Sequence, residues 1–180
     1  MQNKYTYRIV VTALFSALIC AATILIQIPM PATGGYVNLG DSIILICAAL
    51  MDPLCAVLAA GLGSCLADVM TGYVVFAPGT LIIKALMGLV ASLILRHSEQ
   101  PSSPLKRTLM ILLANLAAEA IMISGYFLYE SVFLGMGLGA AGSILGNIGQ
   151  GAFAVIASGI LIPILRSSPI LMKLMQKTKS

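Results

Sequence analysis

The chain alternates between long apolar runs and short polar connections. A bilayer core about 30 Å thick requires roughly 20 apolar residues per spanning helix, and fewer where a loop covers one end of the helix. The clearest polar break is the linker HSEQPSSP, and prolines close the first run at Pro29 and Pro31. We therefore predict an all-α integral membrane protein, a single membrane domain over residues 1–180. Its six transmembrane helices are expected at about 8–28, 39–51, 53–70, 78–95, 105–128 and 140–165.

Composition supports this interpretation. The 180 residues are 59% hydrophobic and only 9% charged, whereas a soluble domain contains about 45–50% apolar residues. The first run is too long for the apolar part of a signal peptide, so we expect it to remain in the mature protein. The four cysteines lie inside apolar runs without metal-binding spacing, which favours small core residues. We expect neither a metal site nor a cofactor.

Lysine and arginine mark one side of the predicted domain. Cytoplasmic loops hold these residues in excess. All but one of them precede the first helix, flank the HSEQPSSP linker or follow the sixth helix: Lys4, Arg8, Arg96, Lys106, Arg107, Arg166, Lys173, Lys177 and Lys179. The opposite connections, MPATGGYVN, TGYVVFA and YESVFLGMGLG, contain neither residue. This pattern predicts a multi-pass protein of the cell membrane with both termini in the cytoplasm, and it argues against nucleic-acid binding.

Polar residues inside the predicted helices indicate a functional site. A charge within the bilayer costs at least ~2.5–3.5 kcal/mol, so an intramembrane ionisable group is a candidate functional residue. With the predicted topology, polar groups from five helices meet at similar depth in the outer half of the membrane: Asp41, Asp68, Lys84, Glu119, Asn147 and Gln150. The last two are about one helical turn apart and therefore share nearly the same face.

Two interpretations of this cluster remain open. In the first, Lys84 forms a structural ion pair with Asp68 or Glu119, and Asp41 caps its own helix. In the second, the groups line a water-accessible binding cavity, which also explains the amides at the same depth and the restriction of polarity to one leaflet. Asp52 is separate, because Asp directly before Pro53 at a cytoplasmic turn is typical of a helix N-cap.

Aromatic residues share the asymmetry of the polar cluster. Seven of them gather at or beyond the outer helix ends, namely Tyr36, Tyr73, Phe76, Tyr126, Phe127, Tyr129 and Phe133. An interfacial belt is one explanation, but a belt usually marks both faces of the membrane. A pocket lined by rings would suit a planar heteroaromatic ligand. The neighbouring GMGLGAAG stretch is interpreted as either a mobile lid or a tight turn.

A stripe of small residues follows the first helix. Ala13, Ala17 and Ala21 recur at four-residue spacing, which lets another helix approach closely. Such a stripe serves either a partner subunit or packing inside the bundle, and the sequence AAGLGSCLA in the third helix has a similar character.

The stretches GGYVNLGDSIIL and AAGLGSCLADVMTGYVVFAPGTLIIKALMGL carry a family resemblance. Its most specific part is the spacing of Asn38-Leu39-Gly40-Asp41, Gly63, Ala67-Asp68, Gly72-Tyr73, Ala77-Pro78, Thr80 and Lys84. Over about residues 8–95 the chain resembles the substrate-binding S components of energy-coupling factor (ECF) vitamin transporters, particularly the riboflavin-transporter-like group. The second half of the chain matches in pattern only.

The resemblance implies six helices with both termini inside and a vitamin pocket in the outer half. In this family the small-residue stripe of the first helix, here Ala13 and Ala17, packs on a transmembrane coupling subunit that two cytoplasmic ATPases drive. The chain itself contains no phosphate-binding loop of the form G-x-x-x-x-G-K-[ST]. The candidate substrate-binding residues are Tyr36, Asn38, Asp41, Asp68, Tyr73, Lys84, Glu119, Tyr126, Asn147 and Gln150, and the candidate docking residues are Ala13, Ala17 and Ala21.

The leading hypothesis is a vitamin-binding subunit of an ECF-type importer, embedded in membrane lipid, rather than an enzyme. A self-sufficient carrier would use the same polar cluster without partners. An intramembrane lipid-processing enzyme is disfavoured because the sequence contains no G-x-S-x-G or H-E-x-x-H motif, and its single histidine, His97, lies in the linker region. Vitamin B6 forms, hydroxymethylpyrimidine, riboflavin and pantothenate all remain open as substrates, with a preference for a pyrimidine- or pyridine-type ring.

Overall fold

The computed structural model describes residues 4–97, 103–169 and 171–173. The main elements within these residues are long α-helices, a short central helix, a two-stranded hairpin and two short helical turns. They are α1 (Lys4–Leu25), β1 (Gln27–Met30), β2 (Gly35–Asn38), α2 (Gly40–Leu50), α3 (Pro53–Thr71), α4 (Ala77–His97), α5 (Pro104–Leu128), the π-helical turn η1 (Tyr129–Phe133), the 3₁₀ turn η2 (Gly137–Ser143) and α6 (Ile144–Ser167).

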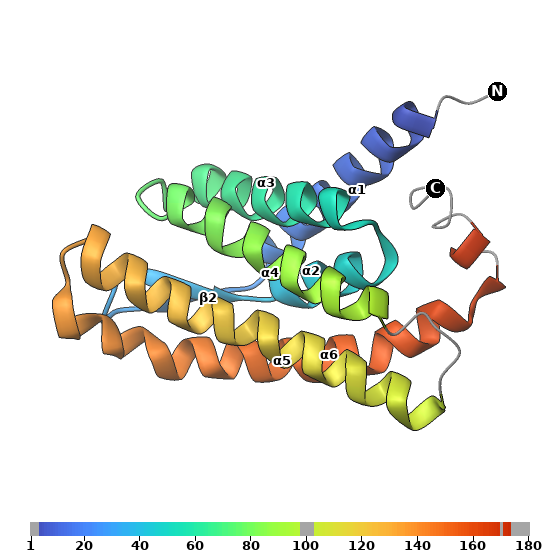
Figure 1. Ribbon diagram of the computed structural model, residues 1–180. Helices are drawn as coiled ribbons and strands as arrows, with labels where there is room; N and C mark the ends of the chain where they lie inside the picture. The colour runs from blue at the N-terminus through green and yellow to red at the C-terminus, as the bar shows by residue number, and fades with distance from the viewer. Residues whose placement is uncertain (1–3, 98–102, 170, 174–180) are drawn as a thin grey trace.

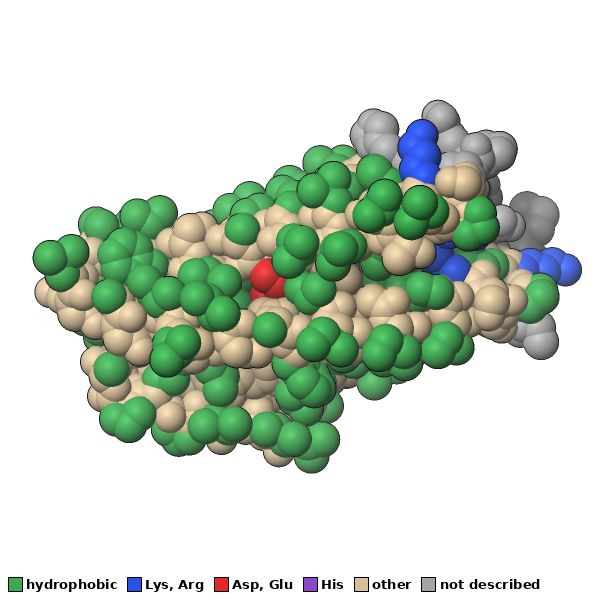
Figure 2. Space-filling model, turned by 90° about the horizontal axis from the view of Figure 1, so that it is seen from below, with side chains coloured by type: hydrophobic (Ala, Val, Ile, Leu, Met, Phe, Trp, Pro, Cys, Tyr) green, Lys and Arg blue, Asp and Glu red, His purple; other side chains and the backbone are tan. Residues whose placement is uncertain are grey.

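The long helices form two layers around a short central helix. Helices α3 and α4 pack together on one side and α5 and α6 on the other, while α2 and the hairpin lie between them (Figure 1). Helix α2 packs against α4 and α6, and α1 packs along α3. Helix α1 begins and α6 ends at the same end of the bundle, and lysine and arginine side chains gather at that end (Figure 2).

The helical membrane architecture predicted from hydropathy is confirmed. Within the described residues, five helices are long and apolar enough to cross a membrane, and α2 is the shorter sixth. With 11 residues, α2 extends only about 16 Å, roughly half of the hydrocarbon thickness. Its first turn, at Gly40 and Asp41, therefore lies within the bundle rather than at its outer surface.

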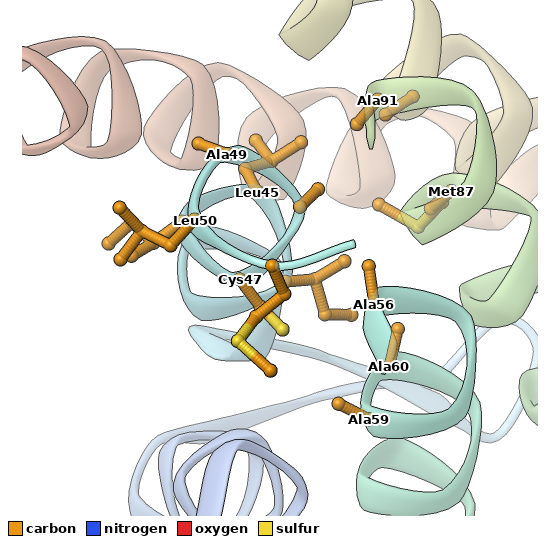
Figure 3. Close-up of a cluster of buried hydrophobic side chains, with 14 of the residues drawn as sticks. Leu45, Cys47, Ala49, Leu50, Ala56, Ala59, Ala60, Met87 and Ala91 are labelled. Atoms are coloured by element: carbon orange, nitrogen blue, oxygen red, sulfur yellow. The ribbon is translucent and has the colours of Figure 1, made fainter. Parts of the chain in front are cut away.

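Small side chains allow α2, α3 and α4 to approach one another closely. Leu45, Cys47 and Leu50 of α2 lie in one cluster with Ala56, Ala59 and Ala60 of α3 and with Met87 and Ala91 of α4 (Figure 3). A Cβ added at Gly88 would lie 2.8 Å from the carbonyl oxygen of Ala56, and one added at Gly63 would lie 2.5 Å from the carbonyl oxygen of Ser16. The small residues of α3 thus serve packing inside the bundle.

The segment after α1 corrects the predicted first helix. We expected helix as far as residue 28, but α1 ends at Leu25 and Gln27–Met30 forms the first strand of an antiparallel hairpin. Pro29 supplies no amide hydrogen for a continuing helix. Gly34 takes a φ of +70° in the turn, a conformation that glycine adopts without steric cost. The strands pair in a register that places Pro29 opposite Tyr36.

The outer connection between α5 and α6 is helical rather than extended. Turn η1 continues α5, and η2 leads into α6, which begins at Ile144 instead of the predicted 140. Of the two interpretations of the glycine-rich stretch, the tight turn fits the backbone, because Gly135 and Gly137 have φ values of +70° and +53°.

Asp52 fulfils the predicted role of N-cap for α3. Its Oδ1 accepts hydrogen bonds from the backbone amides of Leu54 and Cys55, at 2.9 and 3.2 Å. Its Oδ2 forms an ion pair with Arg8, at 2.7 Å. The carboxylate therefore caps α3 and also ties α1 to it at the basic end of the bundle.

Candidate functional site

A small cavity lies beneath the hairpin, where all the layers of the bundle meet. Its lining comes from both strands, from α3, α4, α5 and α6, and from the connections between them: Met30, Gly35, Tyr36, Asn38, Asp68, Phe76, Thr80, Tyr126, Glu130, Asn147 and Gln150. Six of the ten predicted substrate-binding residues belong to this lining. Helix α2 stops halfway across the bundle and leaves space beyond its first turn. The hairpin fills this space only in part, so a cavity remains beneath it.

A network of charged and amide groups forms the floor of the site. Lys84 of α4 contacts Asp41 of α2 in an ion pair in which both side chains are buried. Gln150 of α6 donates to Asp41 Oδ2 at 2.6 Å, and its Oε1 accepts from the backbone amide of Asn38 at 2.6 Å. Four candidate residues from three helices and one strand are thereby joined in a single hydrogen-bonded chain.

This network corrects one of the two interpretations of the sequence. The structural alternative paired Lys84 with Asp68 or Glu119 and made Asp41 a helix cap. Instead Lys84 pairs with Asp41, and the Gly40 amide at the start of α2 donates to Asn38 Oδ1, at 2.8 Å, rather than to Asp41. The spacing along a helix predicts the depth of a side chain in the membrane, but the neighbour that it faces depends on how the helices pack.

Aromatic residues form the wall beneath the hairpin. The Tyr36 hydroxyl donates to Asp68 Oδ1, and burial raises the pKa of Tyr36, so this hydroxyl remains a donor at neutral pH. The Tyr36 and Tyr73 rings lie 4.4 Å apart between centroids. Across the cavity, the hydroxyl groups of Tyr126 and Thr80 are 2.9 Å apart. Tyr73 does not line the cavity but supports the ring that does.

Several polar atoms around the cavity are buried without a partner. Within the described part of the chain, no hydrogen bond reaches Asp68 Oδ2, Asn147 Nδ2 or either carboxyl oxygen of Glu119. Buried polar atoms without a hydrogen-bond partner are uncommon in folded proteins, and each one calls for an explanation. Asp68 and Asn147 line the cavity, whereas Glu119 lies behind it, against Gly151 of α6.

Glu130 is a lining residue that we did not single out from the sequence. It belongs to η1, is only 1% exposed, and its Oε2 accepts from Ser143 Oγ at 2.5 Å. A signal was available, since Glu130 is the one acidic residue in the three lysine-free outer connections. Nothing local in the sequence, however, shows that η1 turns this side chain inward. Thr80 and Phe76 were likewise noted in the sequence without being assigned to the site.

The candidate docking residues lie on the outside of the bundle. Ala13, Ala17 and Ala21 are all exposed on α1. The first two line an open apolar groove between α1 and α3, which we call the α1–α3 groove. It has a volume of about 610 Å³, and its other walls are Tyr5, Arg8, Ile9, Thr12, Ser16, Leu54, Cys55, Leu58, Leu62 and Leu66. The alternative of packing inside the bundle does not fit this placement of the alanines.

Comparison with known proteins identifies the family of this chain. The family model of the ECF-type riboflavin transporter S component matches residues 3–167, nearly the whole chain. This chain belongs to that family. An uncharacterised protein of Pyrococcus woesei is also similar, with 35% identity over 155 residues that cover 85% of this chain and 99% of the relative.

The S component family is a family of vitamin-transporter substrate-binding subunits, and this chain is a multi-pass membrane protein of that kind. The match extends well past residue 95, so it includes the second half of the chain, which contributes Glu119, Tyr126, Glu130, Asn147 and Gln150. Among the described residues there is no group of three or more histidine, cysteine, aspartate or glutamate side chains placed to hold a metal ion. Polar and aromatic contacts are what the cavity offers a ligand.

Proposed function

We propose that this S component captures a B-type vitamin or vitamin precursor in the cavity beneath the hairpin and delivers it to the cytoplasm with ATP-driven partner subunits. The observation that carries the proposal is the set of buried, unsatisfied polar atoms on Asp68 and Asn147 beside the rings of Tyr36 and Tyr126. A bound heteroaromatic molecule would supply the missing hydrogen bonds at its edge and stack on the rings with its face.

Binding requires the cavity to widen. Its open space amounts to about 20 Å³, room for little more than a water molecule, whereas small-molecule sites usually measure roughly 300–1,000 Å³. The hairpin is the proposed moving element, because its two strands pair only with each other in the described structure and individual hydrogen bonds, such as those of Tyr36 to Asp68 and of Asn38 to Gln150, hold it over the cavity. We therefore assign the hairpin as the part that opens toward the outer surface and closes over the ligand.

Coupling to the partners is assigned to the opposite end of the molecule. The α1–α3 groove presents Ala13 and Ala17 of α1 opposite a row of leucines on α3, and small residues let a partner helix approach closely. With the basic end of the bundle in the cytoplasm, this groove extends from the cytoplasmic surface along the membrane-facing side. A transmembrane coupling subunit lying in the groove would be in reach of two cytoplasmic ATPases.

The experiment that tests the function has a binding arm and a transport arm. Mass spectrometry identifies whatever small molecule co-purifies with the detergent-extracted protein, and a thermal-shift screen of B vitamins measures which of them stabilises it. We expect one vitamin class to raise the melting temperature. Liposomes containing the chain alone, without ATP, should then show no accumulation of that vitamin. Accumulation by the chain alone would instead support a self-sufficient carrier.

A further inference from the structure

We infer that the cavity selects vitamins that are uncharged or positively charged and that donate hydrogen bonds, and that it rejects carboxylate- and phosphate-bearing ones. The inference rests on the proposed function and adds the chemical class of the substrate. It is carried by the charges that the fold places around the cavity, and by the buried oxygen that the fold leaves without a donor.

The half of the molecule that contains the cavity has a single cationic side chain, that of Lys84. In the sequence, Lys84 is the only lysine or arginine between Arg8 and Arg96, and none occurs between Arg107 and Arg166. Lys84 does not line the cavity, and its ammonium is held by Asp41. A ligand anion could recruit it only by leaving the buried Asp41 carboxylate with Gln150 alone, and a buried charge without its partner is strongly destabilising.

Carboxyl groups, by contrast, are concentrated at this site. Asp68 and Glu130 line the cavity, and Asp41 and Glu119 lie directly behind it. Because Asp41 and Lys84 balance each other, the remaining three carboxyl groups can add only negative charge. An anionic ligand would therefore enter a site of zero or negative charge and would lose its hydration without a cation to replace it.

The buried polar atoms without partners in the cavity lining specify the hydrogen bonds that a ligand must make. Asp68 Oδ2 is an acceptor without a donor among the described residues, and Asn147 Nδ2 is a donor without an acceptor. The two residues come from α3 and α6, so they face the cavity from opposite layers. A heteroaromatic ring with an amino, amide or hydroxyl group on one edge and a ring nitrogen or carbonyl oxygen on another would satisfy both. This chemistry removes pantothenate from the candidate substrates and retains uncharged or cationic pyridines, pyrimidines and flavins.

Matched ligand pairs test the inference on the intact purified protein. The pairs are nicotinamide and nicotinate, pyridoxal and pyridoxal 5′-phosphate, riboflavin and riboflavin 5′-phosphate, and pantothenol and pantothenate. Calorimetry should show that, for each pair with measurable binding, the uncharged member binds at least about 100-fold more tightly, because an unpaired charge is costly to bury. Binding of an anionic member within about threefold of its uncharged partner would overturn the charge selection while leaving the proposed function intact. Failure of every compound in this set and in the wider vitamin screen would contradict the proposed function itself, and the inference with it.

Neutralising variants identify the carboxyl groups responsible. Asp68→Asn and Glu130→Gln preserve shape and should lower the preference for the uncharged member at least about tenfold, because the anionic member then meets one carboxylate fewer in the cavity. Asp52→Asn is the matched control, since it neutralises a buried carboxylate at the basic end of the bundle and should leave the preference unchanged. Each variant is first checked for a cooperative thermal transition, and the two cavity variants are independent of each other. An unchanged preference in either folded cavity variant would show that its carboxyl group does not set the selectivity.

Discussion

The ammonium of Lys84 in α4 contacts the carboxylate of Asp41 in α2, and the two side chains are only 2% and 1% exposed. Because α2 crosses just half of the bundle, this ion pair joins its first turn to a full-length helix inside the bundle. The pair also supports the cavity, since Gln150 bonds to Asp41 and to the backbone of Asn38 at the end of the hairpin. We therefore expect stability and the proposed ligand binding to be linked through one carboxylate.

Replacing Lys84 by Met should affect both properties. It leaves Asp41 buried without its cation, so the free energy of unfolding should fall by about 3–5 kcal/mol. Binding of the identified vitamin should weaken at least about tenfold, or ~1.4 kcal/mol, because the floor of the cavity loses its organising charge. Glu119→Gln should weaken binding less, since neither carboxyl oxygen of Glu119 is bonded to the network among the described residues.

The double variant Lys84→Met with Asp41→Asn separates these two effects. Removing both charges should recover most of the lost stability without restoring affinity. Calorimetry on the folded variants measures the affinity, and thermal unfolding in detergent measures the stability. Unchanged affinity in folded Lys84→Met would mean that the network is purely structural and that the site has been assigned wrongly.

At the opposite end, Asp52 should matter for stability and not for the ligand. Asp52→Ala removes the N-cap of α3 and the partner of Arg8, and we expect a loss of about 1–2 kcal/mol. Asp52→Asn retains a capping oxygen and should lose less. Vitamin affinity, measured in parallel, should be the same in both variants, and a change in affinity would indicate that this end is coupled to the cavity.

The sequence predicted which candidate site residues lie near one another better than which of them are in contact. Apolar runs and the positions of lysine and arginine locate the helices and place Asp41, Asp68 and Lys84 at one level, because hydrophobicity and charge act on each segment separately. The partner of Lys84 depends on helix rotation and on how far α2 extends, which are set by packing against the small residues of α3 and α4. Local periodicity contains no information about either.

The hairpin and Glu130 were missed for a related reason. The segment QIPMPATGGYVN is too short and too rich in proline and glycine to show a strand pattern by itself, and α6 contacts it through Gln150, which bonds the backbone of Asn38. Glu130 follows α5 in a segment without helix-breaking residues, so its inward direction comes from the π-helical turn η1. Both features arise where tertiary packing outweighs local preference.

Tyr36→Phe tests the role of the Tyr36 hydroxyl in the wall of the cavity, because it removes one oxygen atom. The variant keeps the ring that faces Tyr73 but removes the donor to Asp68, so both carboxyl oxygens of Asp68 would then be unsatisfied. Affinity should fall by about tenfold, and Tyr36→Ala, which also removes the ring, should lower it further. If calorimetry gave the same affinity for Tyr36→Phe and Tyr36→Ala, or the wild-type affinity for both, the role assigned to Tyr36 would be contradicted.

The α1–α3 groove can be tested independently of ligand binding. Ala13→Leu with Ala17→Leu fills the groove with side chains that prevent close helix approach. The isolated variant should fold and bind the vitamin normally, while ATP-dependent uptake by cells that co-express the coupling subunits should be abolished. Ala120→Leu, an equally exposed change on α5, is the control and should transport normally. Uptake at the wild-type rate in the double variant would refute the docking face, and loss of affinity in the isolated variant would contradict the separation of docking from ligand binding.

Asn147→Leu tests most directly whether the cavity is the vitamin site. Leucine has nearly the same shape, and the Asn147 amide nitrogen is buried without a partner among the described residues, so the substitution should leave stability unchanged or raise it. Native mass spectrometry of the purified protein with added vitamin should show one molecule bound to the wild type and at least about tenfold weaker binding to Asn147→Leu. Equal binding by a stable Asn147→Leu protein would contradict the assignment of this cavity as the vitamin site.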